Sequence, residues 1–433
     1  METPFDYFFD DRTNPRTIEA LNGGPLASAL EAYARRFTVS LVVAPVAGQL
    51  AGVEPTPFAL RHAERVIVLP LDQALHPLFQ LIARHRDPAA RRVAMKAYPR
   101  PRAFFYDPVL LREAMAARLG TAPRVATVHV GRLYMAPLAE TYFGSARCIL
   151  DMDEDDARTL RRIAGLRIAN GDVTGAEGDE ADAGKFETLA NEYLPRFAFS
   201  LVASEQDKAS LESRYPGARI GVIENAIRPG AAMTLPGGIA PIDLLMVGSL
   251  GYYPNIDAAQ FFCREILPRL RSATPTLSLT ILGSRPASSV TALGQEKGVT
   301  IAADVPDPAP YYAAARAVVA PIRAGGGSRI KILEAFAQGR PVVATRLAAE
   351  GLDVADGHHL LIADQADDFA AAVLRLLSDP DLGAGLVIAA RALVAERYDV
   401  ARVAQRIEGL ADGPGAMIEC ADPDAQSQRG HHA

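Results

Sequence analysis

The strongest constraint on the fold is a repeating alternation of short apolar runs with longer segments rich in Ala, Leu and Arg. Uninterrupted apolar runs are typical of parallel strands buried on both faces, and the segments between them have the character of amphipathic helices. The first half of the chain therefore predicts a parallel sheet with crossover helices. Its expected strands are residues 38–45, 65–70, 126–131, 146–153, 198–205 and 218–225.

The same alternation begins again after residues 227–241, a stretch rich in Pro and Gly that offers little to pack. Such a composition is typical of a connection between domains. We therefore expect two Rossmann-like α/β domains that face each other across a cleft, over residues 1–228 and 242–411, with a linker at 229–241. The strands expected in the second domain are the runs IDLLMVGS, LSLTILGS, GVTIAA, ARAVVAPI, RPVVATR and HLLIAD.

Composition excludes several classes of protein. The 433 residues, 49% hydrophobic and 22% charged, have ordinary globular values and exceed the size of one average domain. A net charge of −6 argues against nucleic acid as a partner, and three cysteines are too few for a disulfide framework or a zinc site. No apolar run reaches the roughly 18 residues of a spanning helix, and the acidic N-terminus does not resemble a signal peptide. We expect a soluble, cytoplasmic protein.

Two segments are expected to lack regular structure. Residues 170–184, NGDVTGAEGDEADAG, are acidic and rich in Gly, which predicts a mobile loop. Residues 412–433 show no periodicity and are predicted to be a disordered tail, in which His431 and His432 are inert. The helix expected just before this tail is one that can cross back to the first domain.

The most informative segment is residues 318–352, which predicts a strand, a glycine loop, a helix and a second strand. Gly325, Gly326 and Gly327 carry no side chains that would block a ligand, and Ser328 is a good N-cap for the helix. A glycine loop that leads into a helix N-terminus directs backbone N–H groups and the positive end of the helix dipole at one point. The segment is therefore suited to bind a phosphate.

Two cations in the first turn of the expected helix strengthen this interpretation. The helix dipole disfavours Arg329 and Lys331 there by about 0.3 kcal/mol or more each, unless an anion binds among them. Glu334 follows Lys331 by three residues and shares its helix face. An ordinary capped helix with a solvated Lys–Glu pair is the alternative interpretation.

These residues resemble the nucleotide-sugar-binding motif of family 4 glycosyltransferases, which have the GT-B fold. The likeness is greatest to the subgroup in which a Gly-Gly-Gly loop precedes Arg-x-Lys-x-x-Glu-Ala. It extends to residues 247–270, 279–284, 303–321 and 358–377, and so covers essentially the whole second half of the chain. The first half matches mainly in its alternation of expected strands and helices. The resemblance implies a GT-B fold and transfer of a sugar from a nucleotide diphosphate to an acceptor.

The resemblance also implies roles for residues of the second domain. Glu334 stands where the family binds the ribose hydroxyls of the nucleotide, and many relatives have a second glutamate, for the donor sugar, where this chain has Gly326. Sugar recognition must then come from the glycine loop or from elsewhere. Many relatives hold the diphosphate with an Arg and a Lys after the first strand of this domain, where residues 249–253 contain no cation, so we assign that role to Arg329 and Lys331. The other expected donor-binding residues are Gly248, Ser249, Asn255, Gly325, Gly327 and Ser328.

In the first domain the resemblance is weaker. Gly23 and Gly24 stand in a weak form of the family's opening glycine loop, where diphosphate and acceptor meet, although a simple turn before a helix explains them equally well. His129 ends an expected strand where relatives place a histidine that contacts the donor sugar; a buried core histidine is the alternative. Asp151 and Asp153 form an Asp-x-Asp triplet. In metal-dependent transferases of a different fold such a triplet binds a divalent ion with the donor diphosphate, but we interpret it as an acidic helix N-terminus next to the acceptor or diphosphate loop. We therefore expect no metal, and no cofactor beyond the nucleotide sugar.

A basic run crosses residues 83–102 of this otherwise acidic chain. Seven Arg and Lys side chains, from Arg84 to Arg102, stand against the single acid Asp87. A solvated Arg-rich loop is one interpretation. The other is a patch for an anionic membrane or an anionic acceptor such as a lipid diphosphate, which would place the protein at the inner face of the membrane.

The predicted function is that of a retaining glycosyltransferase whose acceptor is a glycan, a lipid-linked molecule or a small molecule. The leaving phosphate would take the acceptor proton, while His129, Arg329 and Lys331 position the donor and stabilise its charge. Two alternatives stay open. A nucleotide-sugar 2-epimerase of the same fold would convert its substrate without an acceptor, and a non-catalytic subunit, which Gly326 favours, would only bind the donor.

Overall fold

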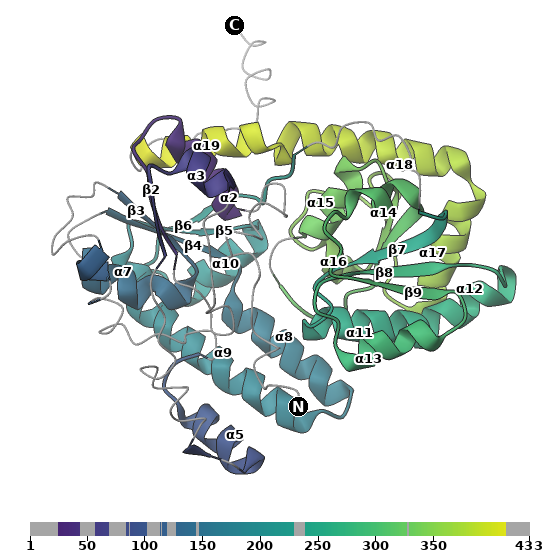
Figure 1. Cartoon of the computed structure of the whole chain (residues 1–433), viewed down its shortest axis with the longest axis horizontal. Coiled ribbons are helices and arrows are strands. Elements are labelled where there is room, and N and C mark those ends of the chain that lie inside the picture. The colour runs from purple at the N-terminus through teal and green to yellow at the C-terminus, as the bar shows by residue number, and fades with distance from the viewer. Residues whose placement is uncertain are drawn as a thin grey trace, which may run out of the picture.

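The computed structural model describes residues 25–43, 57–68, 84–85, 87–101, 113, 115–118, 127–143, 147–228, 239–326 and 329–412. Two α/β domains lie side by side, and the C-terminal helices, drawn in yellow, run along one edge of both (Figure 1). Some predictions fall outside the described residues. They concern Gly23, Gly24, Arg86 and Arg102 of the basic run, Gly327, Ser328, residues 229–238 of the linker, and the tail beyond residue 412.

The C-terminal domain is built on six parallel strands in the order β9-β8-β7-β10-β11-β12. The chain begins in the middle with β7, adds β8 and β9 on one side, and then crosses to β10, β11 and β12 on the other. Ligands of such sheets bind beyond the carboxyl ends of the strands where the winding reverses, which here is between β7 and β10. All six predicted runs form strands: Ile242–Val247 (β7), Leu279–Gly283 (β8), Val299–Ala303 (β9), Ala315–Ala320 (β10), Val342–Ala344 (β11) and Leu361–Ile362 (β12).

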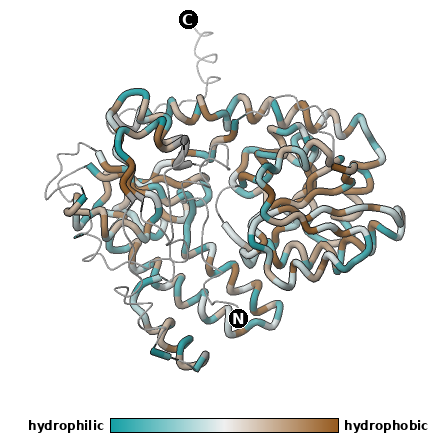
Figure 2. Tube along the Cα trace, in the orientation of Figure 1, coloured by the Kyte–Doolittle hydropathy of each residue, from teal (hydrophilic) through white to brown (hydrophobic). Residues whose placement is uncertain are grey.

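Helices cover both faces of this sheet because side chains alternate between the faces along each strand. Leu244 and Met246 pack on one face with α11, α12 and α17, and Leu245 packs on the other with α14 and α15. Figure 2 shows the apolar strands in the interior of the domain and more polar helix surfaces around them. The helices are α11 (Tyr253–Phe261), α12 (Leu267–Ala273), α13 (Ser288–Thr291), α14 (Ala309–Ala314), α15 (Ile330–Ala337), α16 (Arg346–Ala349), α17 (Ala366–Ser378) and α18 (Pro380–Leu393).

Within the described residues, the N-terminal domain has a four-stranded parallel sheet in the order β3-β4-β5-β6 and a separate parallel pair, β1-β2. Each of the six predicted runs contains one of the strands: Ser40–Val43 (β1), Arg65–Val68 (β2), Thr127–Gly131 (β3), Arg147–Asp153 (β4), Phe199–Val202 (β5) and Ile220–Val222 (β6). The helices are α2 (Pro25–Ala34), α3 (Pro57–His62), α5 (Pro88–Ala97), α7 (Ala136–Phe143), α8 (Asp156–Ala169), α9 (Val173–Tyr193) and α10 (Glu205–Arg214).

The loop predicted over residues 170–184 is wrong, because most of this segment belongs to helix α9. Asp172 caps the helix by accepting a hydrogen bond from the backbone N–H of Gly175 at 2.9 Å. The acidic side chains that indicated a solvated loop are paired instead: Asp179 with Arg167 of α8 at 2.7 Å, and Asp182 with Lys185 at 2.9 Å. The segment is therefore part of a helical hairpin whose acidic side chains are paired and buried, and not the mobile loop that we expected.

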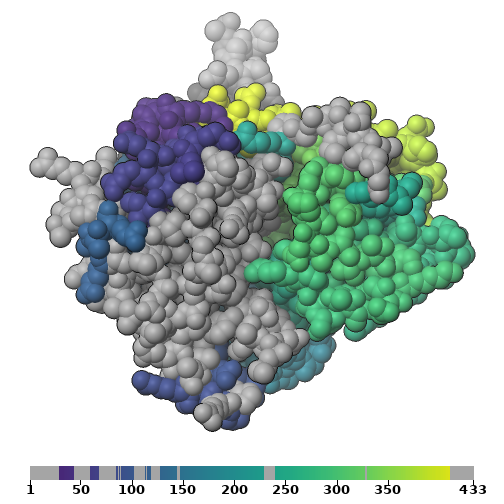
Figure 3. Space-filling view, viewed as in Figure 1, coloured from purple at the N-terminus to yellow at the C-terminus, as the bar shows by residue number. Residues whose placement is uncertain are grey.

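The last described helix, α19 (Val400–Asp412), packs on the N-terminal domain. Val403 and Ile407 lie in one apolar cluster with Ala29 and Ala32 of α2 and with residues of the N-terminal sheet. Figure 3 shows this yellow helix against the purple N-terminal segments. The chain thus passes between the domains twice, and the two passages are hydrogen-bonded to each other, from the N–H of Ile227 to the carbonyl of Tyr398 at 2.8 Å.

Candidate functional site

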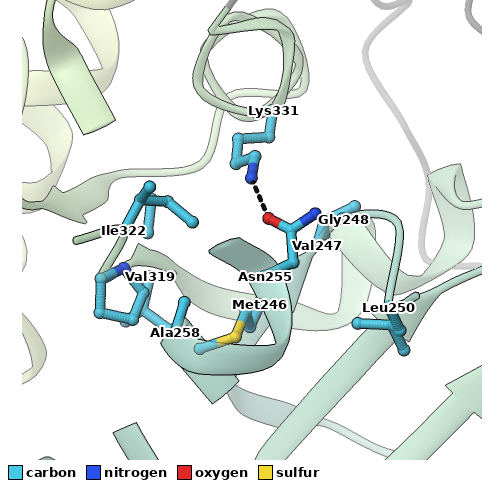
Figure 4. Close-up of a pocket in the computed structure, with 11 residues that line it drawn as sticks. Met246, Val247, Gly248, Leu250, Asn255, Ala258, Val319, Ile322 and Lys331 are labelled. Atoms are coloured by element: carbon cyan, nitrogen blue, oxygen red, sulfur yellow. Dashed lines mark hydrogen bonds between the residues drawn. The ribbon is translucent and has the colours of Figure 1, made fainter. Parts of the chain in front are cut away.

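The loops that follow β7 and β10 line a small pocket at the point where the winding of the C-terminal sheet reverses (Figure 4). Its lining combines apolar side chains of the two strands with Gly248, Asn255 and Lys331. The backbones approach closely here, since a Cβ atom on Gly283 would collide with the carbonyl oxygen of Gly248. The pocket therefore lies where the fold places a ligand and where glycine allows close packing.

A chain of hydrogen bonds connects the predicted donor-binding residues. Lys331 Nζ donates to Asn255 Oδ1 at 2.7 Å, as Figure 4 shows, and Asn255 Nδ2 donates to the backbone carbonyl of Ser249 at 2.8 Å. Gly248 leaves room for this amide, because a Cβ atom there would lie 2.8 Å from Asn255 Nδ2. Residues predicted from the loop after β7, from α11 and from α15 thus lie together at one pocket.

Glu334 follows Lys331 on α15, and its Oε2 accepts a hydrogen bond of 3.0 Å from the hydroxyl of Tyr312. Tyr312 lies on α14 and is fully buried. Burial raises the pKa of Glu334 to about 7, while the hydrogen bond from Tyr312 and the charge of Lys331 act in the opposite direction. The carboxyl group is therefore close to half ionised at neutral pH. The sequence motif did not indicate Tyr312.

The prediction of Ser328 as the N-cap is wrong, because Arg329 occupies the N-cap position of α15 and only Lys331 of the two cations lies in the first turn. Arg329 is also more enclosed than its place in the motif suggested. Its guanidinium donates to the carbonyl of Gly326 at 3.1 Å and to the carbonyl of Glu350 at 3.0 Å. It also lies 3.4 Å from the carboxylate of Glu350. Burial lowers the pKa of Arg329, although the Glu350 charge opposes this. Arg329 thus connects the glycine loop to the loop at Glu350.

The described part of the glycine loop, Gly325 and Gly326, packs against helix α8 of the other domain. Arg162 Nη1 donates to the carbonyl of Gly325 at 3.3 Å. A Cβ atom on Gly326 would collide with Thr159 Oγ1 and lie 2.5 Å from Glu154 Oε2. Gly325 has φ +123°, a conformation that favours glycine. Glycine is therefore required here for the backbone conformation and for the approach of the two domains.

Glu350 holds the domains together beside this loop. Its carboxylate accepts hydrogen bonds from Arg158 at 3.0 Å and from Arg162 at 2.8 Å, both on α8, in addition to its contact with Arg329. Burial opposes ionisation of Glu350, but the hydrogen bond from Arg162 and the charges of the three arginines lower its pKa overall. Arg158 also lies 3.2 Å from Asp207. These side chains form an ionic clamp between the domains, which we call the Glu350 clamp.

The C-terminal domain matches a known family model, and the whole chain resembles several solved structures. Residues 241–379 match the family model described as Glycosyl transferases group 1. A sucrose-phosphate synthase from Thermosynechococcus elongatus superposes with a TM-score of 0.60 at 16% identity, covering 89% of this chain and 91% of its own. HepE from Anabaena, in complex with UDP and glucose, superposes with a TM-score of 0.57 at 15% identity, covering 90% of this chain and 95% of its own. At 15–16% identity the likeness concerns the fold. The fold is GT-B.

TarM from S. aureus, in complex with fondaparinux, alpha-GlcNAc-glycerol and UDP, superposes with a TM-score of 0.56 at 14% identity over 72% of this chain. This chain spans only 60% of that structure, and 59% of a second TarM structure. A search of curated protein sequences found no match. The comparisons thus show the GT-B fold for the chain and a match to the group 1 family model within its C-terminal domain.

In the N-terminal domain of this GT-B chain, His129 and Asp151 lie on the adjacent strands β3 and β4. Nε2 of His129 is 3.3 Å from Asp151 Oδ2, and Nδ1 is 3.1 Å from the hydroxyl of Tyr33 on α2. The histidine side chain is 11% exposed. The structure thus brings two predicted residues together and holds the imidazole from both sides. Tyr33 was not predicted, because it comes from a distant segment.

The Asp-x-Asp triplet has protein partners at both ends. Besides Asp151 with His129, Asp153 lies 3.2 Å from Arg132 and accepts a hydrogen bond from Asn225 Nδ2 at 2.9 Å. Asp155, two residues later, caps α8 by accepting from the N–H of Arg158 at 3.2 Å. Among the residues that the structure describes, no group of three His, Cys, Asp or Glu side chains is arranged to hold a metal ion.

Proposed function

We propose that this chain is a retaining glycosyltransferase that transfers a sugar from a nucleoside-diphosphate donor to a glycan, a lipid-linked molecule or a small molecule. The pocket between the loops of β7 and β10 supports this most directly, because Lys331 lines it and Glu334 follows Lys331 one turn later on α15. A cation and a carboxylate at this spacing suit the two polar parts of a nucleotide, its phosphates and its ribose.

In this proposal, the Glu334 carboxylate accepts hydrogen bonds from the ribose hydroxyls. Lys331, which faces a neutral amide in the pocket, binds the diphosphate. Arg329 contributes mainly by holding the carbonyl of Gly326, so that the glycine loop keeps the conformation that receives the phosphates. Gly248, Ser249 and Asn255 supply the opposite wall of the pocket.

The transfer itself needs one bond to form and one to break. The acceptor oxygen attacks the anomeric carbon of the sugar, the bond from that carbon to the diphosphate oxygen breaks, and the leaving phosphate takes the acceptor proton. No covalent enzyme intermediate is needed for this route. Lys331 stabilises the charge on the leaving diphosphate, and His129, held by Asp151 and Tyr33, contacts the sugar from the N-terminal domain.

Thermal stability in the presence of candidate donors tests the proposal. UDP-glucose, UDP-N-acetylglucosamine, ADP-glucose and GDP-mannose are added separately at a large excess, with and without EDTA. A donor at a hundredfold excess over its Kd stabilises the protein by about 2.7 kcal/mol. We expect at least one donor to stabilise the protein and to be hydrolysed slowly without an acceptor, with EDTA making no difference.

The other outcomes of the donor experiment distinguish the alternatives. Stabilisation by no donor would overturn the proposal. Conversion of the donor to its 2-epimer would identify an epimerase, and binding without hydrolysis or transfer to any acceptor would identify a binding subunit. Loss of activity with EDTA, restored by manganese or magnesium, would return Asp151 and Asp153 to consideration as metal ligands.

We also propose that the basic run from Arg84 to Arg102 contacts an anionic surface, which would place the enzyme on the inner face of the membrane. In Figure 1, α5 projects from the edge of the N-terminal domain. Arg92 on this helix is exposed, whereas Lys96 lies 3.2 Å from Glu177 of α9. None of the described helices is long and apolar enough to cross a bilayer.

A further inference from the structure

The side chains that meet the glycine loop at Gly326 come from the N-terminal domain. Thr159 Oγ1 donates a hydrogen bond to Glu154 Oε2 at 2.6 Å, and these two oxygens occupy the space into which a side chain at position 326 would project. Both residues are at least 90% buried, with 6% and 7% of their surface exposed for Glu154 and Thr159. A carboxylate and a hydroxyl of one domain thus contact the phosphate-binding loop of the other.

The Glu154 carboxylate is held in one orientation. Oε2 accepts the hydrogen bond from Thr159, and Oε1 lies 3.6 Å from Arg132 Nη1 on the other side. Arg132 is itself fixed, because it donates to the carbonyl of Met152 at 2.9 Å and lies 3.2 Å from Asp153. A carboxylate fixed by its neighbours in this way is preorganised for binding.

The location of this carboxylate relative to the donor follows from the proposed function, on which this step rests. If the nucleotide lies over the pocket of the C-terminal domain, the sugar beyond its diphosphate must point toward the N-terminal domain, where the acceptor binds. The glycine loop lies at this boundary, and Gly326 contacts Thr159 and Glu154 there. Sugar hydroxyls are hydrogen-bond donors, and a carboxylate accepts several hydrogen bonds at once.

We propose that Glu154, oriented by Thr159 and Arg132, accepts hydrogen bonds from hydroxyl groups of the donor sugar and so determines which sugar is bound. The N-terminal domain then supplies the sugar-recognising carboxylate, and Gly326 is a glycine so that this carboxylate reaches the loop. Sugar recognition requires the domains to be closed, because Glu154 and Gly326 belong to different domains.

Glu350 offers a control, because its carboxylate also lies at the boundary between the domains, where it pairs with Arg158 and Arg162 of α8. A residue that only holds the domains together affects every ligand of the cleft in the same way. A residue that contacts the sugar affects the nucleotide sugar and not the nucleoside diphosphate. The ratio of the two affinities therefore distinguishes sugar recognition from a clamp.

The experiment compares the full-length protein with Glu154→Gln and Glu350→Gln. Calorimetric titration measures Kd for the donor selected from the panel of four nucleotide sugars and for its own nucleoside diphosphate. For Glu154→Gln we expect about a tenfold weaker Kd for the nucleotide sugar and less than a twofold change for the nucleoside diphosphate. For Glu350→Gln we expect the two Kd values to change by the same factor.

Equal changes of both Kd values in Glu154→Gln, or no change in either, would overturn the assignment of Glu154 and leave the proposed function intact. If the unaltered protein binds neither ligand of any pair, the proposed function itself fails. Glu154→Asp, which keeps the charge and withdraws it by one methylene group, replaces Glu154→Gln if that variant does not fold. For Glu154→Asp we also expect a weaker Kd for the nucleotide sugar and not for the nucleoside diphosphate. If this variant binds both ligands as the unaltered protein does, the assignment is equally contradicted.

Discussion

The hydroxyl of Tyr312 donates a hydrogen bond of 3.0 Å to the carboxylate of Glu334 and so connects helix α14 to helix α15. The bond fixes the direction of the carboxylate that we assign to the ribose. It also favours ionisation of Glu334, whereas burial favours the neutral form and raises the pKa to about 7. The protonation state of the nucleotide site is therefore sensitive to pH near neutrality.

Donor binding is expected to strengthen as pH rises through about 7. Only the ionised Glu334 accepts two hydrogen bonds from the ribose, and a group with a pKa of about 7 is about 10% ionised at pH 6 and about 90% ionised at pH 8. Calorimetric titration with a nucleotide sugar, whose phosphates do not titrate in this range, should give a Kd roughly five- to tenfold weaker at pH 6 than at pH 8.

The Glu334→Gln variant is the control for this pH dependence and should bind the donor weakly with little change between pH 6 and pH 8. Tyr312→Phe removes a bond that favours ionisation, so it should move the midpoint of the pH dependence to a higher value. A pH profile that is the same in all three proteins would show that Glu334 does not contact the nucleotide.

Lys331→Met should weaken binding of the nucleoside diphosphate selectively. Hydrogen bonds to charged groups contribute about 1.5–3 kcal/mol, so we expect a loss of roughly tenfold or more for the diphosphate and less than twofold for the parent nucleoside. Arg329→Ala is the comparison, since it removes a buried side chain that contacts Gly326 and Glu350. Arg329→Ala should lower the melting temperature and weaken the binding of both ligands by a similar factor. Equal losses for both ligands in Lys331→Met would assign Lys331 a structural role.

Gly283→Ala should destabilise the C-terminal domain by about 1–3 kcal/mol, because the new Cβ atom would collide with the backbone carbonyl of Gly248. Chemical denaturation monitored by circular dichroism measures this change. Gly385→Ala is the matched control: Gly385 lies inside helix α18 with no neighbouring atom within 4 Å of the added Cβ. It should stabilise the protein by about 0.5–1 kcal/mol. If Gly283→Ala leaves the free energy of unfolding unchanged, the loop after β7 moves aside easily.

The basic run should bind anionic vesicles at low salt. Each cation near an anionic surface contributes about 1 kcal/mol, and physiological salt screens the attraction over a Debye length of ~8 Å. Co-sedimentation with phosphatidylserine vesicles should therefore fade at high salt. Replacement of Arg91, Arg92 and Lys96 by Gln should abolish it and leave donor binding unchanged. If the protein does not bind these vesicles at any salt concentration, we infer that its acceptor is soluble or uncharged.

The strands could be predicted from the sequence because parallel strands buried on both faces need uninterrupted apolar runs, such as the one that forms β10. The glycine motif likewise indicated Lys331 and Glu334, since their spacing places both on one face of α15. Helix α9 could not be recognised in the same way. Its acidic residues are neutralised by Arg167 and Lys185, and the sequence does not show that Arg167 on another helix would lie close to it.

The contacts between the domains could not be predicted from the sequence either. Glu154 and Thr159 stand more than 160 residues from Gly326, and no local pattern connects them with the glycine loop. The same holds for Arg162 of the N-terminal domain with Glu350 of the C-terminal domain. Each pair depends on how two folded units meet. The residues that join the two domains at the cleft could therefore be identified only from the structure.

The return of α19 to the first domain has a consequence for synthesis on the ribosome. The surface formed by Ile149, Leu201 and α2 is covered by Val403 and Ile407, which are made about 180 residues after Ile227. At about 5–20 residues per second, this apolar surface stays uncovered for roughly 10–35 s while the second domain emerges. During this interval the nascent chain exposes a face that chaperones and other nascent chains can bind. The first domain to be translated is thus the last to be completed.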